Sequence, residues 1–238
     1  MGLDQANMSR RDGFTLVEIL VAIVVFGIII STIFASYTGT FKIIDETERQ
    51  ADIYEMSRIA LDRICEDLES AYIKSGGEGP ETGDEIREKM RFVGEEKEIE
   101  GAGSDFLRFL SSAHIAFGEE DVDCGIAEIV YYVSEDQEGD DGLALYRSDT
   151  PQFKESPQEG SGGLILCSGL YSIDFRFYDI KGEVYESWDS RSDESKDKLP
   201  ARVTVEILFL NSSNPESPYR FMAGVSLPLA REKYEKAT

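Results

Sequence analysis

The sequence has one histidine, one tryptophan and three cysteines among its 238 residues. A serine or cysteine hydrolase would need His114 as its base, yet the run from Ala113 to Phe117 around it is typical of a β-strand. We expect a hydrogen-bonded or solvent-exposed strand histidine there. The motifs G-x-S-x-G, G-x-x-x-x-G-K and G-x-G-x-x-G do not occur in the sequence. The chain is therefore predicted not to be an enzyme.

The three cysteines are Cys65, Cys124 and Cys167, too few for a disulfide framework. None lies in a C-x-x-C or C-x-x-H spacing, so zinc and redox sites are not indicated. One bridge at most can form. If the domain is exported, we predict a bridge between Cys124 and Cys167, because Cys65 falls in a separate predicted helix.

Basic residues are scarce, since 24 Lys and Arg stand against 47 Asp and Glu and leave a net charge of -23. Such a charge disfavours nucleic acid and anionic lipid headgroups as partners, because both are polyanions. Basic partners and divalent cations remain compatible with it. Calcium is the one cofactor candidate, through the acidic runs 119–123 and 135–142. Neither run fits an EF-hand loop, so acidic solvated turns are the alternative and no cofactor is expected.

One long apolar run is present, with no charged residue from Ile19 to Phe41. At about 1.5 Å per residue this is long enough to cross a bilayer. Arg10 and Arg11 precede the run, and the positive-inside rule therefore places the leader in the cytoplasm and the large domain outside it. No A-x-A type cleavage site follows the run, unlike in a secretory signal peptide.

Glu18 lies at the start of this apolar run. A carboxylate at mid-bilayer costs about 2.5–3.5 kcal/mol, and less near the interface. A plain signal anchor, in which Glu18 reaches to the headgroups, is one interpretation. The other is that Glu18 has a charged partner.

The segment from Arg10 to Glu18 reads R-R-D-G-F-T-L-V-E and resembles the signature of the type IV prepilin family. This resemblance implies that a membrane-embedded prepilin peptidase cuts after Gly13 and methylates the new amino group of Phe14, giving N-methylphenylalanine. It also implies that Glu18 is the assembly carboxylate. The amine at Phe14 of one subunit would neutralise Glu18 of a neighbour, so that each charge has a partner in a low-dielectric helix bundle.

Beyond the membrane run, a helical period continues and predicts one helix from Phe14 to Lys74. The apolar stripe of its second half is expected to pack on a core, with the charged residues, Asp67 among them, on other faces. The break at 75–80 is rich in Gly and ends the pattern. The predicted divisions are a leader (1–13), a transmembrane helix segment (14–41), an amphipathic helix continuation (42–74) and a β-rich head (75–238). The stripe consists of Tyr54, Leu61, Ile64, Leu68 and Ala71.

After residue 100, short runs rich in Val, Ile, Tyr and Phe alternate with Gly, Asp and Pro clusters, which predicts antiparallel strands. The turn 179–182 is expected to join two of them in a hairpin. The predicted fold class is α+β and pilin-like, a long N-terminal helix packed on an antiparallel sheet. The predicted strands are 106–110, 113–117, 126–133, 143–147, 163–167, 170–178, 203–210 and 219–227.

The second half resembles the minor pseudopilin J family of type II secretion systems. The resemblance rests on Tyr131-Tyr132, the runs 143–147 and 170–178, Trp188, and the Leu-Pro pair before the strand at 203. It implies an inner-membrane, single-pass subunit with a periplasmic head, placed at the tip of a periplasmic pseudopilus that supports protein export. Implied partners are the I and K type pseudopilins, with H and G types as further candidates, the prepilin peptidase and the inner-membrane secretion platform. A minor type IV pilin and a membrane-anchored periplasmic binding or adhesive module are the alternatives.

Overall fold

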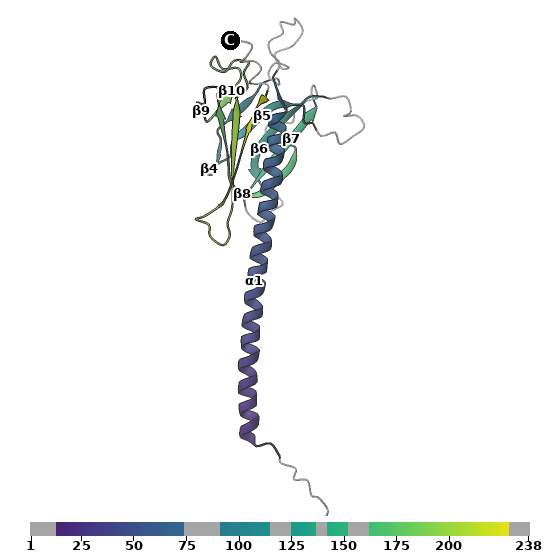
Figure 1. Ribbon diagram of the computed structural model, residues 1–238, viewed down its shortest axis with the longest axis vertical. Coiled ribbons are helices and arrows are strands. Elements are labelled where there is room, and N and C mark those ends of the chain that lie inside the picture. The colour runs from purple at the N-terminus through teal and green to yellow at the C-terminus, as the bar shows by residue number, and fades with distance from the viewer. Residues whose placement is uncertain (1–12, 74–90, 115–124, 137–141, 152–161, 229–238) are drawn as a thin grey trace, which may run out of the picture. The chain divides into compact units, whose positions relative to one another are not determined.

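The structure is a computed structural model that describes residues 13–73, 91–114, 125–136, 142–151 and 162–228. Its one long helix, α1, spans Leu16–Glu69 (Figure 1). The chain divides into two compact units, one up to Asp52 and one from Ile53 onward. The last turns of α1 therefore belong to the head unit, whereas the predicted head began only at residue 75.

In the head unit, α1 packs one face onto the sheet. Ile64 and Leu68 of the predicted stripe are fully buried, but Tyr54 is 54 % exposed. The helix ends at Glu69, whereas the sequence predicts an end at Lys74, because Ala71 and Tyr72 pair with strand β5 (Phe106–Ser111). This strand pairing replaces the helical hydrogen bonds of the last turn. The buried residues of the helix are Ser57, Ala60, Ile64, Asp67 and Leu68.

The sheet has ten antiparallel strands in the order β10-β2-β5-β6-β7-β8-β11-β12, with β1 added to β5 and β9 to β8. The end of α1 lies across β5, β6 and β7 (Figure 1). This arrangement confirms the predicted α+β, pilin-like fold class. The strands are β1 (Ala71–Tyr72), β2 (Val93–Glu95), β5 (Phe106–Ser111), β6 (Ala127–Glu135), β7 (Leu143–Pro151), β8 (Leu164–Tyr178), β9 (Val184–Tyr185), β10 (Trp188–Asp189), β11 (Arg202–Phe209) and β12 (Tyr219–Ser226), and a separate hairpin pairs β3 (Glu98–Ile99) with β4 (Ala102–Gly103).

The long strands agree with the sequence pattern, and the differences are of three kinds. The two runs 163–167 and 170–178 form the single strand β8, because Gly169 has a φ of 72° and lets the strand bend where its pairing shifts. Ala113 and His114 follow β5 outside any strand. The short strands β2, β3, β4 and β10 were not predicted, since two or three residues give no readable alternation.

The predicted hairpin at 179–182 is confirmed. The Asp179 carbonyl accepts a hydrogen bond from the Gly182 N–H at 3.1 Å, and its carboxylate accepts the N–H groups of Lys181 and Glu183. Gly182 has a φ of 86°, which glycine adopts without strain. The turn leads directly into β9.

Aromatic rings fill the core between the sheet and the helix. Phe92 stacks on Phe109 and meets the edge of Phe177, and Phe109 stacks on Tyr131. Gly94 is needed beside them, since a Cβ there would lie 2.0 Å from the Phe177 ring. Each fully buried Phe side chain contributes roughly 1.5–3 kcal/mol to folding.

Asp105 is buried where the β4 segment meets β8. One carboxylate oxygen accepts the Phe175 N–H at 2.7 Å and the other accepts the Lys97 N–H at 3.3 Å. Burial, with a smaller contribution from the nearby Asp174 charge, raises the pKa of Asp105 to about 6, although these hydrogen bonds and the Arg176 charge lower it. The folded state therefore holds a proton on Asp105 in a pH range where the unfolded chain has released it.

This proton gives the stability of the head a pH dependence with a defined sign. The stabilisation is fully present below the unfolded pKa near 4 and is lost as the pH rises through about 6. We expect the stability difference between wild type and Asp105→Asn to fall by about 1 kcal/mol from pH 5 to pH 7. Urea unfolding of the full chain in detergent, followed by the fluorescence of the single tryptophan, measures it. A difference that stays constant or grows with pH would contradict the assignment.

Candidate assembly site

The first turn of α1 forms a capping box. Thr15 precedes the helix, and its N–H and hydroxyl both donate to Oε2 of Glu18 at 3.0 Å. In return, the Thr15 hydroxyl accepts the Glu18 N–H at 3.3 Å. The Thr15 side chain therefore caps the helix, and Glu18 is held by its own subunit. Gly13 and Phe14 lie before the cap, and Phe14 is 83 % exposed.

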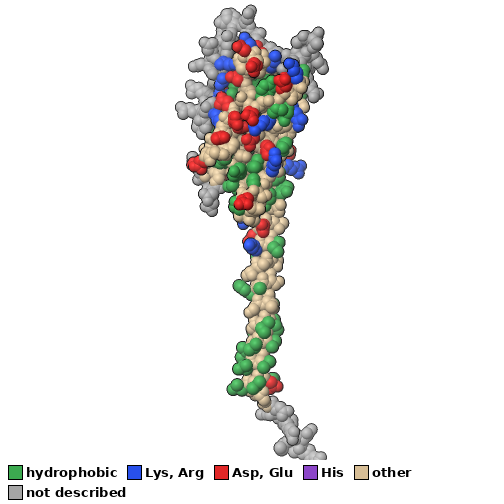
Figure 2. Space-filling model, turned by 90° about the vertical axis from the view of Figure 1, so that its left-hand side faces the viewer, with side chains coloured by type: hydrophobic (Ala, Val, Ile, Leu, Met, Phe, Trp, Pro, Cys, Tyr) green, Lys and Arg blue, Asp and Glu red, His purple; other side chains and the backbone are tan. Residues whose placement is uncertain are grey.

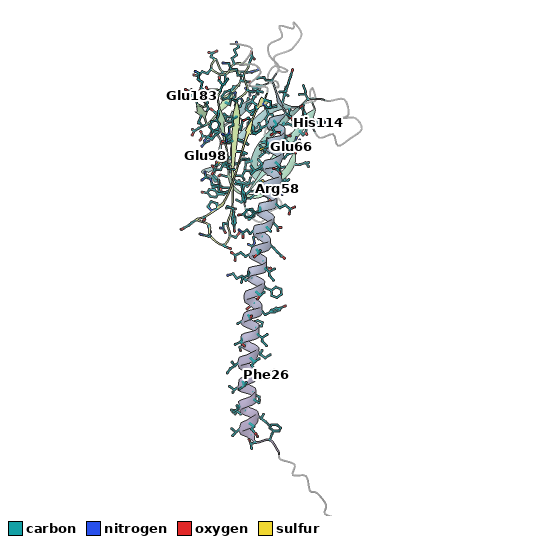
Figure 3. The ribbon with its side chains drawn as sticks, viewed as in Figure 1. Phe26, Arg58, Glu66, Glu98, His114 and Glu183 are labelled. Atoms are coloured by element: carbon teal, nitrogen blue, oxygen red, sulfur yellow. The ribbon has the colours of Figure 1, made fainter. Side chains whose placement is uncertain are left out.

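The helix segment that follows is apolar on all sides. Its large apolar side chains, from Phe14 to Ile44, are 42–83 % exposed, and Phe26 projects freely from the helix (Figures 2 and 3). In the described part of the chain, α1 is the one helix long and apolar enough to cross a membrane. A helix that is hydrophobic all round needs an apolar environment, such as lipid or other helices.

One face of this segment is a shallow groove that begins at Glu18. The lining residues recur at helical spacing, and Ala22 is the smallest of them. The groove therefore places the carboxylate at the N-terminal end of an apolar surface suited to a second helix. Its lining consists of Val17, Glu18, Val21, Ala22, Val25, Phe26 and Ile29.

A family model described as the prokaryotic N-terminal methylation motif matches this part of the chain. Residues 8–34 carry the N-terminal methylation motif. A comparison with curated proteins finds no match. The match covers Gly13, Phe14 and Glu18, the residues for which the sequence predicts processing and assembly roles. It supports the predicted resemblance to the type IV prepilin-like family. The motif and the apolar helix together indicate a chain anchored in the membrane by a single pass.

A second cluster, in the head unit, joins α1 to the sheet by buried charges, and we call it the Asp67 cluster. Asp67 on α1 is fully buried and accepts two hydrogen bonds from Arg147 on β7, at 2.7 and 3.1 Å. Tyr131 on β6 donates to the same carboxylate at 2.5 Å, and Arg63 lies 2.6 Å from it. The Asp67 charge therefore fixes the helix against two neighbouring strands.

The electrostatics of the Asp67 cluster follow from burial and pairing. Desolvation raises the pKa of Tyr131 well above its usual range, and the adjacent Asp67 charge adds to this. Burial lowers the pKa of Arg147, but the hydrogen bonds and charge of Asp67 outweigh that effect and hold it above its usual value. Both groups stay protonated at any pH at which the protein is handled.

The single histidine closes the Asp67 cluster on one side. His114 Nδ1 lies 2.6 Å from Asp149, whose other oxygen lies 3.0 Å from Arg147. The His114 side chain is 7 % exposed. The expectation of a hydrogen-bonded histidine is met, although its position in a strand is not. Its partners give it a structural role in the head.

Sequence reasoning missed the Asp67 cluster, because Asp67 was assigned to a solvated helix face. Asp67 is fully buried between Ile64 and Leu68 in the packed face. The available signal was its position, three residues after one stripe residue and immediately before another. A buried carboxylate needs cationic partners, and one of them, Arg147, lies 80 positions away in the sequence, whereas Arg63 lies on the same helix.

The structure describes only some of the residues in the predicted cysteine pair and in the acidic runs proposed for calcium. Cys167 is buried on β8, and burial raises the pKa of its thiol to about 12. Cys124 lies outside the described residues, so its pairing with Cys167 stays a prediction. The acidic run 119–123 and residues 137–141 also lie outside them. Among the described residues, no group of three His, Cys, Asp or Glu side chains is placed to hold a metal ion.

A polar cleft of about 450 Å³ lies beside the β8–β9 hairpin. Carboxylates from three places line it, and three of them, led by Glu183, raise the pKa of the Tyr185 phenol. Two lysines also line it, which partly balances the charge. The lining includes Asp179, Lys181, Glu183, Tyr185, Trp188, Asp189, Glu194 and Lys198.

Proposed function

We propose that the chain is a minor pseudopilin of a type II secretion system, a tip or initiation subunit of the periplasmic pseudopilus that supports protein export. The observation that carries the proposal is the capped Glu18 at the head of an exposed apolar groove, within an N-terminal methylation motif. Glu18 has Thr15 as a hydrogen-bond partner in its own subunit, and in this proposal its positively charged partner comes from a second chain.

In this proposal two interactions hold neighbouring subunits together, an ion pair and the packing of apolar helices. After cleavage, the new amine at Phe14 of a neighbouring subunit would approach Glu18 and form an ion pair away from water. The neighbour's apolar helix would lie in the groove from Val17 to Ile29, where van der Waals packing holds helices together in lipid. The ion pair would set how far the two helices are shifted along each other, and the groove would supply most of the contact between them.

The partners follow from this mechanism. They are other pseudopilins, of the I and K types and also the H and G types, the prepilin peptidase that frees Phe14, and the inner-membrane secretion platform. The head would stand in the periplasm, since Arg10 and Arg11 mark the leader as the cytoplasmic end. Nucleic acid is no partner in this proposal, because the chain carries a net charge of -23.

Two alternatives have an observation in their favour. A minor type IV pilin would use the same motif and helix, and the secretion role rests on the likeness of roughly residues 104–210 to minor pseudopilin J. A membrane-anchored binding module would use the polar cleft at Tyr185 for a basic ligand. In such a module the apolar segment of α1 would serve as the membrane anchor.

Processing at Gly13 provides the first test. We expect Gly13→Leu to leave the chain uncleaved and in the inner membrane, with secretion blocked, because the peptidase must fit the residue before the cut. The mass of the purified chain measures cleavage. Gly27→Leu is the matched control, since an added Cβ meets nothing within 4 Å at either glycine. Normal cleavage and secretion by Gly13→Leu would defeat the proposal.

A further inference from the structure

The two ends of the ten-stranded sheet differ in how they meet solvent. At one end lies β10, only two residues long, and the turn after it uses the backbone acceptors there. Ser195 Oγ donates to the Asp189 carbonyl at 2.5 Å, and the Asp197 N–H donates to the Ser190 carbonyl at 2.8 Å. This end is short and satisfied within the chain, as natural sheets usually arrange their edges.

At the other end lies β12, which has none of these protections. Eight consecutive residues pair with β11 without a bulge, from Tyr219 to Ser226. In the described part of the chain, β12 pairs with β11 alone. Arg220 is its only charged residue, and its side chain is held by Glu206 of β11. The strand therefore offers a long, regular row of backbone donors and acceptors along its outer edge.

Apolar side chains flank this open edge on both faces of the sheet. On the helix face, Phe221 meets the edge of Tyr54, a residue of α1 in the same unit, with ring centroids 5.1 Å apart. Tyr54 is 54 % exposed, and Met222 on the opposite face is 59 % exposed. One more strand with apolar side chains would cover both, since neighbouring strands lie about 4.8 Å apart.

We propose that the open edge of β12 receives an extended strand from the head of a different prepilin-like subunit, with basic residues beside that strand. Main-chain hydrogen bonds would give the affinity, and the apolar flanks would set the register. A second copy of this chain fits poorly, because two chains of net charge -23 repel each other. The partner class rests on the proposed function, since subunits that assemble through their helices bring their heads together.

The test uses the full chain in its native cells, with a photocrosslinking amino acid in place of Ser226, an exposed residue of β12. A matched probe replaces Glu186, whose side chain is 64 % exposed near the β10 end. We expect position 226 to crosslink to another protein that carries an N-terminal methylation motif, at a segment with basic neighbours, and position 186 not to do so. Mass spectrometry of the crosslinked peptides identifies both.

A substitution separates strand addition from mere proximity. Met222→Lys, which puts a charge beside the edge, should lower the crosslinking yield at position 226 about tenfold, whereas Met222→Leu should keep it. Crosslinks only to a second copy, to a protein without the motif or to lipid would overturn the proposal, as would a yield that Met222→Lys leaves unchanged. If cleavage after Gly13 and secretion are normal in these cells, such a result counts against the β12 edge and not against the pseudopilin function.

Discussion

Asp67→Ala is expected to lower the free energy of unfolding of the head by about 3–5 kcal/mol, because it leaves Arg63 and Arg147 in the head without their shared anion. Arg147 is 7 % exposed and loses two hydrogen bonds, while Tyr131 loses its acceptor. Typical domains have only about 5–15 kcal/mol of stability in total. Urea unfolding of the full chain in detergent, with the single tryptophan as the probe, measures the loss.

Two further variants show whether charge is the cause. Asp62→Ala on the same helix removes an exposed pair with Arg58 and should change stability by less than about 0.5 kcal/mol. The double variant Asp67→Leu with Arg147→Met should recover part of the loss, because it removes the buried Arg147 guanidinium, which Asp67→Ala leaves with Asp149 but without Asp67. A loss below about 1 kcal/mol in Asp67→Ala would mean that solvent reaches the Asp67 cluster and that the helix is held by apolar packing alone.

The Asp67 cluster also shows where sequence reasoning reaches its limit. A carboxylate on a helix is solvated in most proteins, and only the tertiary structure shows that Arg147 and Tyr131 face Asp67. The length of α1 was misjudged for the same reason, because the pairing of Ala71 and Tyr72 with β5 depends on a strand about 40 residues away. Local pattern predicts the existence of elements, and long-range contacts decide their ends.

The N-terminal segment, by contrast, has local signals, because Gly13, Phe14 and Glu18 lie within six residues and an apolar helix follows. The apolar helix and the match to the methylation motif agree with the sequence prediction, and the processing and assembly roles of these three residues stay predictions. The long strands could also be predicted. Apolar and polar residues alternate along β8 and β11, as expected for strands in a sheet with one packed face. The open edge of β12 was not, because the sequence does not say which strand is last in the sheet.

Replacing Glu18 should distinguish the effects of its two interactions, the hydrogen bonds with Thr15 in its own subunit and the proposed ion pair with the amine of a neighbouring subunit. Glu18→Val is expected to leave membrane insertion and cleavage intact but to lower recovery of the chain with other pseudopilins at least about tenfold. Removing the carboxylate leaves the neighbour's Phe14 ammonium without a counter-charge in lipid, which is costly. Co-purification of the tagged full chain with the proposed pseudopilin partners, scored against total chain in the membrane, measures recovery.

Two matched variants decide which interaction matters. Glu18→Gln keeps an oxygen that can accept from Thr15 but removes the negative charge, so it should fail to assemble as Glu18→Val does. Thr15→Val removes the hydroxyl that bonds Glu18 while keeping the charge, and it should cost about 1 kcal/mol of helix stability and assemble at close to the wild-type level. If Glu18→Gln assembles normally and Thr15→Val does not, the carboxylate serves the helix cap, and the ion pair between subunits is wrong.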